Sequence, residues 1–277
     1  MSLSPESFYL NYNNHRIHYL KFGSGEKLLF CFHGFGESAY VFSVLQSSIE
    51  KNYTVVSIDL PLHGLTQWNE KYFVKKDVNE IILQLMQDFG KEKCSLMGFS
   101  LGGKIVIGAM SLMPESVEEI FLIAPDGLRK NIWYNLAIYP SWGRKLFLNL
   151  VQHPEKYIAL VKFLAAIKIV PNAMKKFVES QLETKEKRQQ VFDVWLCIRD
   201  FDTKVSEARM LLNKHNIACY LFFGEFDKVI RPAFGKNFVR GLKNYQLSIL
   251  PKGHNLVKDY LNLELQKILL AVRDGKH

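Results

Sequence analysis

Short apolar runs with the length of β-strands alternate with longer helical patterns along most of this chain. These runs are KLLFCF (27–32), TVVSID (54–59), CSLMG (94–98), EEIFLIA (118–124), IACYLFFG (217–224) and YQLSIL (245–250). Strands that are apolar on both faces belong to parallel sheets that helices cover on both sides. Two alternating segments around the polar turn Asn13-Asn14 add a hairpin. The sequence therefore predicts an α/β fold with a mostly parallel, eight-stranded sheet and helices on both of its faces.

The alternation of strands and helices stops near Gly127 and resumes near residue 204. Between these points the chain has amphipathic helical patterns rich in tryptophan, tyrosine and phenylalanine, and no convincing strand. Because the strands on either side need one another to form one sheet, we expect a core domain made of 1–126 and 204–277. Residues 127–203 are predicted to form an inserted helical cap, in which 157–170 would be a buried helix that roofs the site of the core.

The positive charge of the chain, formally +9, is unevenly distributed. Residues 126–204 hold 14 Lys and Arg against 8 Asp and Glu, a net +6, which leaves +3 for the rest and suggests that the excess is concentrated in this segment. We interpret it as a solvated helical face, with binding of anionic ligands or of an anionic membrane surface as the alternative. We expect no nucleic-acid partner, and at most weak association with a membrane surface rather than stable insertion.

The cysteines and the N-terminal residues bear on the compartment. The four cysteines lie far apart and form no C-x-x-C motif, and three of them sit in apolar strand-like runs. Free thiols packed as small hydrophobes explain them better than a disulfide framework or a zinc site. The first residues lack a basic segment followed by an apolar one, and no run of eighteen apolar residues occurs. These features predict a cytoplasmic protein without a metal site.

Polar residues follow the predicted strands at the edge where α/β sheets bind their ligands. The residues in question are His33, Asp59, Ser100, Asp126, Asp227 and His254. A serine becomes a nucleophile when an imidazole takes its proton and a carboxylate orients that imidazole. The chain order Ser100, Asp227, His254 is the order expected for such a triad on this kind of sheet. Asp126 is the rival acid, with capping of the first cap helix as its alternative role.

The segment SLMGFSLGGKIV (95–106) fits two motifs that both need a strand, a sharp turn and a helix. Gly98 to Lys104 nearly spells a phosphate-binding P-loop, but the next residue is Ile105, so the hydroxyl that would hold Mg²⁺ is absent. The alternative is G-x-S-x-G, in which Gly98 and Gly102 make room for a strained turn around Ser100. We favour this second motif, and Lys104 then becomes a surface or packing lysine.

Five motifs in order carry a resemblance to a known family. They are HGFG (33–36), DLPLHGLT (59–66), GFSLGG (98–103), GEFD (224–227) and GH (253–254). With these motifs the chain resembles the α/β-hydrolase fold superfamily, in its serine-nucleophile branch with a helical cap. Leu62 and Thr66 depart from the usual glycine and serine of the second motif. The serine argues against the haloalkane dehalogenase and epoxide hydrolase branches, which need a carboxylate at that position.

The resemblance implies an oxyanion hole made by the backbone N–H groups of Phe35 and Leu101. The helix that begins at Leu101 would add a favourable dipole. His33 and His63 would brace loops through hydrogen bonds, and Asp59 would hold its own loop. Phe99 and Trp195 are predicted to line an apolar substrate pocket.

The expected activity is that of a cofactor-free serine hydrolase, a carboxylesterase-like enzyme that cleaves a carboxylic ester or a related small acyl compound. His254 would activate Ser100, which would form an acyl-enzyme that water then hydrolyses. Three alternatives remain open: a C–C bond hydrolase or lyase that uses the same triad, a non-catalytic receptor for a small ligand, and a lipase-like enzyme that acts at membrane surfaces. The sequence does not indicate the oligomeric state.

Overall fold

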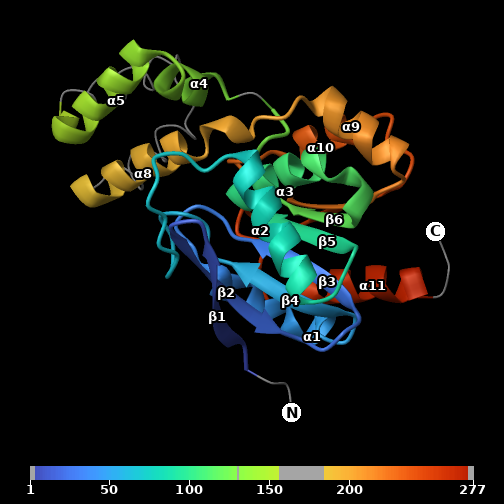
Figure 1. Ribbon diagram of the computed structural model, residues 1–277. Helices are drawn as coiled ribbons and strands as arrows, with labels where there is room; N and C mark the ends of the chain where they lie inside the picture. Colours follow the sequence, from blue (N-terminus) through green and yellow to red (C-terminus); the bar gives the residue numbers. More distant parts are fainter. Residues whose placement is uncertain (1–3, 130, 156–183, 274–277) are drawn as a thin grey trace. The chain divides into compact units, whose positions relative to one another are not determined.

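One sheet of eight strands organises the chain (Figure 1). The computed structural model describes residues 4–129, 131–155 and 184–273. The strands are β1 (Glu6–Tyr12), β2 (His15–Phe22), β3 (Lys27–Phe32), β4 (Tyr53–Ile58), β5 (Cys94–Phe99), β6 (Val117–Ile123), β7 (Ala218–Gly224) and β8 (Tyr245–Leu250). Their spatial order is β1-β2-β4-β3-β5-β6-β7-β8. β2 pairs antiparallel with both β1 and β4, and the other neighbours are parallel, so the predicted fold class is confirmed.

Helices cover the sheet and connect its strands. In the described part of the chain they are η1 (Ala39–Leu45), α1 (Gln46–Ile49), α2 (Lys75–Asp88), α3 (Leu101–Leu112), η2 (Pro114–Ser116), α4 (Ile132–Ile138), α5 (Ser141–Gln152), α8 (Lys185–Cys197), η3 (Arg199–Phe201), α9 (Val205–Lys214), α10 (Pro232–Phe238) and α11 (Leu261–Arg273). α2 and α9 contact α3, which lies against β3, β5 and β6. α1 contacts α11. In the element order, helices lie between successive parallel strands, as in the usual α/β crossover (Figure 1).

The middle of the sheet is buried on both faces, as its apolar runs predict. Every residue of β5 is buried, and so is every residue of β3 after Lys27. Phe42 of η1, Ile49 of α1 and Leu265 of α11 belong to one apolar cluster with side chains of the central strands. This burial fixes which ends of the strands meet at the same edge, and thereby positions the loops that carry the polar residues.

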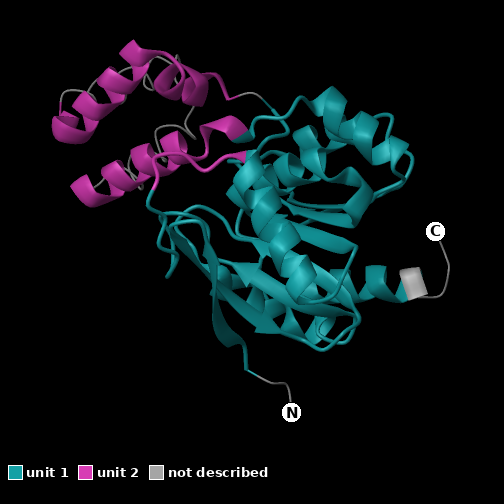
Figure 2. Ribbon diagram, viewed as in Figure 1, with its two compact units in different colours: residues 1–69, 75–129, 201–277 teal, residues 70–74, 130–200 magenta. Residues whose placement is uncertain are grey.

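Contacts divide the chain into two compact units (Figure 2). Unit 1 comprises 1–69, 75–129 and 201–277, and contains the sheet. Unit 2 comprises 70–74 and 130–200, and in the described residues it contains α4, α5 and α8. The predicted helix at 157–170 lies outside the described residues. The role of unit 2 as a cap stays a prediction.

Aromatic side chains form the core of unit 2. Trp195 of α8 packs edge-on against Tyr134 and Phe147, with ring centroids 5.3 Å and 5.7 Å away. The Tyr134 hydroxyl also donates to the Trp195 carbonyl oxygen at 3.0 Å. Asn131 caps α4 by accepting from the backbone N–H of Tyr134. The expectation that Asp126 caps this helix is therefore wrong, because the helix begins six residues later, at Ile132.

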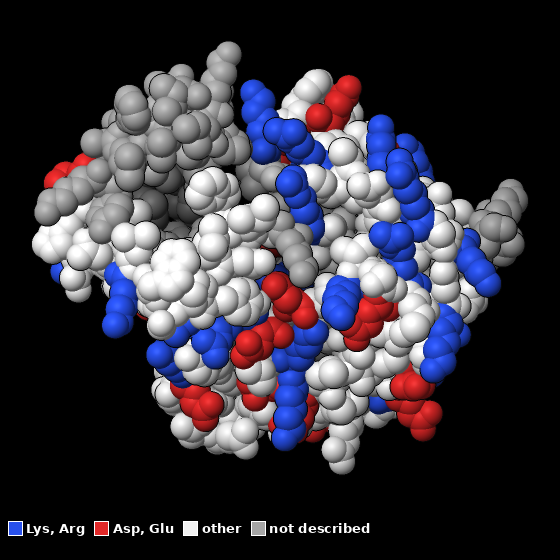
Figure 3. Space-filling model, turned by 90° about the horizontal axis from the view of Figure 1, so that it is seen from above, with Lys and Arg blue, Asp and Glu red and all other residues white. Residues whose placement is uncertain are grey.

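The basic side chains do not gather in the inserted segment alone. Residues 205–277 hold 12 Lys and Arg against 6 Asp and Glu, whereas 1–125 hold 10 against 13. The C-terminal segment thus carries as much excess charge as 126–204, which corrects the sequence-based interpretation. Figure 3 shows Lys and Arg side chains gathered at the right of the face that is viewed. No helix in the described ranges is both long and apolar enough to cross a membrane.

Candidate active site

Ser100 lies at a strained turn between β5 and α3. Its backbone has φ 50° and ψ −112°, a region that residues with a Cβ seldom adopt. The Ser100 N–H donates to the Ile123 carbonyl oxygen at 3.0 Å, and the Ser100 carbonyl oxygen accepts from the Asp126 N–H at 2.8 Å. These bonds to the end of β6 hold the turn in place, in the strand–turn–helix setting that the G-x-S-x-G motif needs.

The two glycines of the motif are required by close backbone packing. A Cβ on Gly98 would lie 2.4 Å from the Gly102 carbonyl oxygen. A Cβ on Gly102 would lie 1.8 Å from the Phe32 carbonyl oxygen and 2.9 Å from that of His33. The first turn of α3 is thus pressed against the end of β3, which brings the helix N-terminus next to the HGFG loop.

Replacing Gly102 by alanine should lower the free energy of unfolding by about 3 kcal/mol, because the new methyl group meets rigid backbone. Urea unfolding monitored by circular dichroism measures the change. Gly253→Ala is the matched control, since a Cβ there has no atom within 4 Å and its φ is not positive. Equal stabilities of the two variants would contradict the packing argument.

His254 connects Ser100 to Asp227. Its Nε2 lies 3.0 Å from Ser100 Oγ, and its Nδ1 lies 2.7 Å from Asp227 Oδ2. A carboxylate opposite Nδ1 favours the tautomer that carries its proton there, which leaves Nε2 free to accept the serine proton. The three side chains come from the turns after β5, β7 and β8, so the sheet brings together residues that are far apart in the sequence.

Asp227, rather than Asp126, is the carboxylate that contacts the histidine. Asp227 is 4% exposed, and its Oδ1 accepts from the backbone N–H groups of Val229 and Ile230 at 2.7 Å and 2.8 Å. These two bonds turn Oδ2 toward His254. The Asp126 carboxylate instead accepts from the Gly127 N–H at 2.8 Å.

The backbone amides of Phe35 and Leu101 are the two predicted donors of the oxyanion hole. Among the described residues, neither the Phe35 N–H nor the Leu101 N–H donates to another protein group. The amides on either side of Phe35 are occupied: the Gly34 N–H donates to Glu37 Oε2 and the Gly36 N–H to His63 Nε2, both at 3.1 Å. The loop is thus fixed with the amide of Phe35 available, as the predicted oxyanion hole requires.

This fold and this geometry agree with the comparison to known proteins, in which residues 27–159 match the profile of the alpha/beta hydrolase fold family. The chain has the α/β-hydrolase fold, and these comparisons support its assignment to the α/β-hydrolase superfamily. It is 21% identical to the uncharacterized hydrolase YugF of Bacillus subtilis over 248 residues, which are 85% of each chain. It is 22% identical to the pimeloyl-[acyl-carrier protein] methyl ester esterase of Neisseria meningitidis serogroup A over 242 residues, 82% of this chain and 70% of the relative.

Solved structures extend this similarity to nearly the whole chain. A hydrolase from Pseudomonas aeruginosa aligns with a TM-score of 0.68 at 16% sequence identity, over 98% of this chain and 99% of the other. At this low sequence identity, the structural match shows the fold alone. Together with the esterases among the sequence relatives, it identifies the chain as a hydrolase of the α/β fold.

Two buried histidines brace the HGFG loop of this hydrolase. His33 Nε2 accepts from the Leu60 N–H at 3.0 Å, while its Nδ1 donates to the Gly34 carbonyl oxygen at 2.7 Å. His63 is held likewise between the Gly36 N–H and the Pro61 carbonyl oxygen. Burial, with His63 nearby, lowers the pKa of His33 to about 4, and burial also lowers the pKa of His63. Both rings are neutral because each needs one nitrogen as an acceptor.

The stability of the hydrolase should fall as the pH drops from about 6.5 to about 4. Between these pH values the unfolded chain binds a proton at His33 and the folded chain does not. The stability that the neutral His33 contributes is therefore complete above the pKa of the unfolded chain, and it is lost as the pH falls to the pKa of the folded chain. The difference is about 3 kcal/mol for His33 alone. His63 acts in the same direction, whereas Glu37, whose pKa is raised by burial, acts in the opposite one.

Urea unfolding at a series of pH values tests this prediction. A His33→Gln variant should show a flatter dependence between these pH limits, whatever its overall stability. A parent protein whose free energy of unfolding stays constant over the range would contradict the assignment of neutral, buried histidines.

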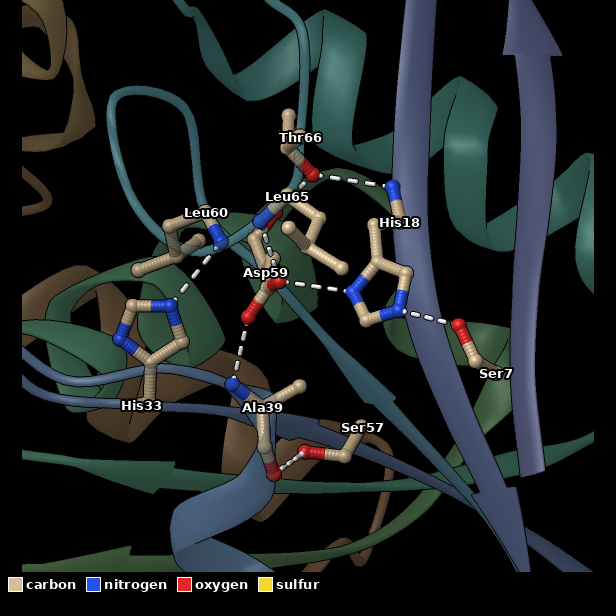
Figure 4. Close-up of polar contacts among 9 residues, drawn as sticks. All are labelled: Ser7, His18, His33, Ala39, Ser57, Asp59, Leu60, Leu65 and Thr66. Atoms are coloured by element: carbon tan, nitrogen blue, oxygen red, sulfur yellow. Dashed lines mark hydrogen bonds and ion pairs between the residues drawn. The ribbon is translucent and has the colours of Figure 1, made fainter. Parts of the chain in front are cut away.

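Asp59 ties together three segments behind the loop (Figure 4). It is 1% exposed, and its Oδ1 accepts from the Ala39 N–H at 2.6 Å. Its Oδ2 lies 2.7 Å from His18 Nδ1 and accepts from the Leu65 N–H at 2.8 Å. Thr66 takes part as well, since its hydroxyl donates to the Asp59 carbonyl oxygen at 2.7 Å and accepts from the His18 N–H at 2.9 Å. Asp59 therefore holds more than its own loop.

The departure at Leu62 has a conformational cost. Leu62 has φ 65°, in the left-handed region that glycine, but not leucine, adopts without strain. Its side chain is exposed. The substitution therefore affects the loop backbone and leaves the Ser100–His254–Asp227 contacts intact.

The residues proposed for the substrate pocket lie in different units. Phe99 is 3% exposed in unit 1, and its ring centroid is 5.4 Å from that of His254. Trp195 is half-buried within the aromatic core of unit 2. Lys104 is 4% exposed, and its Nζ lies 2.7 Å from Asp202 Oδ1, so it is a packed and paired lysine and not a surface one.

Proposed function

We propose that this protein is a serine hydrolase that cleaves a carboxylic ester or a related acyl compound through an acyl-enzyme on Ser100. The observation that carries the proposal is the unbroken hydrogen-bond chain from Ser100 Oγ through His254 to the buried Asp227. In the described part of the chain, the amides of Phe35 and Leu101 have no protein acceptor. A nucleophile, a base, an orienting acid and anion-binding donors are the parts that acyl transfer needs.

The reaction begins when His254 Nε2 takes the proton of Ser100 as Oγ attacks the carbonyl carbon of the ester. The carbonyl oxygen becomes an oxyanion, which accepts from the N–H groups of Phe35 and Leu101. His254 then gives the proton to the departing alcohol, and the acyl group stays on Ser100. A water molecule, deprotonated by His254, attacks this ester and releases the acid. Asp227 stabilises the imidazolium ion in both steps.

The position of Leu101 at the start of α3 strengthens the oxyanion hole. The positive end of the helix dipole lies there, and the first turn of α3 contains no acidic residue to weaken it. Each oxyanion donor of this kind contributes about 3 kcal/mol to transition-state stabilisation.

An apolar acyl group fits the surroundings of Ser100. Phe99 is buried beside His254. Exposed apolar side chains lie in the segments that follow β3, β4 and β7 in unit 1, namely Tyr40 of η1 and the loop residues Leu62, Leu65, Phe226 and Val229. The Neisseria relative is named as an esterase for the methyl ester of an acyl chain, which agrees with this substrate class.

A panel of p-nitrophenyl esters with acyl chains of increasing length tests the proposal. We expect turnover, an initial burst of p-nitrophenol, and a mass adduct of the acyl group on the peptide that contains Ser100. A receptor on the same fold would bind the ester and release no product. The absence of both turnover and the Ser100 adduct across the panel would overturn the proposal.

A further inference from the structure

A second Ser–His–Asp arrangement lies within unit 1, away from Ser100 in the sequence (Figure 4). Ser7 Oγ of β1 lies 2.8 Å from His18 Nε2, and His18 Nδ1 lies 2.7 Å from Asp59 Oδ2. The His18 ring stands between the serine and the carboxylate in the close-up view. Each nitrogen of the ring has one partner, as in the arrangement around His254.

The contacts in this second arrangement match those in the first. The serine-to-histidine distance is 2.8 Å at Ser7 and 3.0 Å at Ser100, and the histidine-to-carboxylate distance is 2.7 Å in both. Asp59, like Asp227, is buried and is fixed by two backbone amides. The carboxylate favours a proton on His18 Nδ1, which leaves Nε2 to accept the proton of Ser7.

Ser7 is open to solvent while its partners are not. Ser7 is exposed, whereas His18 is 4% exposed and Asp59 is 1% exposed. β1 is an edge strand of the sheet, and Ser7 is opposite Leu20 in the β1–β2 pair, two residues from His18. An external reagent can therefore reach the serine oxygen, while the base that acts on it, His18, is buried and held by its bond to Asp59.

We propose that Ser7 is a second activated serine, a covalent modification site for acyl or phosphonyl donors that carry a good leaving group. With a fluorophosphonate, Ser7 Oγ attacks phosphorus, the new P–O bond replaces the P–F bond, and fluoride leaves with the electron pair. His18 takes the hydroxyl proton and passes it to water. With an activated ester, the acyl group is transferred to Ser7 and the alcohol or phenol leaves.

Ser7 is modified once per protein molecule, and the adduct is not hydrolysed to regenerate the serine. Ser7 lies inside a strand, so it lacks the helix N-terminus that Ser100 has for an oxyanion. An acyl or phosphonyl group on Ser7 therefore has no built stabilisation for its hydrolysis. The proposal is independent of the activity proposed for Ser100.

The test uses the full chain with the Ser100→Ala change, treated with an alkyl fluorophosphonate and read by peptide mass spectrometry. We expect an adduct on Ser7 that forms about 10²-fold faster than on Ser47 or Ser206, because a positioned general base contributes at least that factor. Those two serines are exposed, and no histidine contacts them in the described part of the chain. The double variant Ser7→Ala, Ser100→Ala should lose the fast adduct.

A His18→Asn variant in the same background separates activation from simple exposure. The asparagine amide retains a donor for Asp59 but does not reach Ser7, so labelling of Ser7 should fall to the rate of Ser206 while circular dichroism stays that of the parent. If this variant unfolds, the Ser7 to Ser206 rate ratio in the Ser100→Ala protein decides alone. Labelling of Ser7 at the rate of the reference serines, or at an unchanged rate in a folded His18→Asn variant, would overturn the proposal.

Discussion

Replacing Ser100 by alanine is expected to lower kcat/KM for a p-nitrophenyl ester by about 10⁵-fold or more, since nucleophile, base and acid act as a unit. Without Oγ no acyl-enzyme forms, and His254 has no serine proton to accept. The residual rate would come from the oxyanion hole acting on water. Alanine removes only the hydroxyl, so the positive φ at this position remains and the fold should be kept.

Ser111→Ala is the matched control for this experiment. Ser111 lies on the same helix, and its hydroxyl donates to the Gly108 carbonyl oxygen, away from the triad. The control should hydrolyse the ester at the rate of the parent. A Ser100→Ala protein that is folded and still hydrolyses the ester at the parent rate would remove Ser100 from the reaction.

The strand ends could be predicted because they depend on local pattern. Apolar runs identify the buried strands, and the residue that follows each one lies at the carboxyl edge of a parallel sheet. The turn at Ser100 could be predicted for a similar reason. Gly98 and Gly102 are glycines because backbone atoms lie within 2.5 Å of where their Cβ atoms would be. Sterics of this kind leave a mark in a short stretch of sequence.

The contacts of Asp59 could not be predicted in the same way. His18 and Asp59 are 41 positions apart, and they meet only because β2 pairs antiparallel with β4. No motif surrounds His18, and the register that places Tyr19 opposite Ile58 is not encoded in either strand alone. The sequence holds one weak indication of this contact. His18 has an inward position in a strand of alternating pattern, and Asp59 directly follows an apolar strand.

The prediction for the acid of the triad rests on a choice between two carboxylates. Asp126 and Asp227 both follow buried strands and both fit the order Ser, Asp, His, so the sequence favours Asp227 only through its GEFD motif. The geometry adds a reason: Asp227 Oδ1 is taken by two backbone amides, which leaves Oδ2 for His254. Asp126 directs its carboxylate to the amide of Gly127.

Asp227→Asn is therefore expected to lower kcat by about 10⁴-fold, because it imposes the wrong histidine tautomer. The amides of Val229 and Ile230 require an oxygen, so the NH₂ group of the asparagine must face His254 Nδ1. Nδ1 then becomes an acceptor, the ring proton moves to Nε2, and Nε2 can no longer accept the proton of Ser100.

Asp126→Asn supplies the control, since its side-chain oxygen can still accept from Gly127 and activity should be retained. Ester hydrolysis of both variants, with KM determined separately from kcat, distinguishes the two carboxylates. Loss of activity in Asp126→Asn with retention in Asp227→Asn would transfer the role of the acid to Asp126. Because the tautomer argument leaves substrate binding untouched, a large rise in KM in place of a fall in kcat would also contradict it.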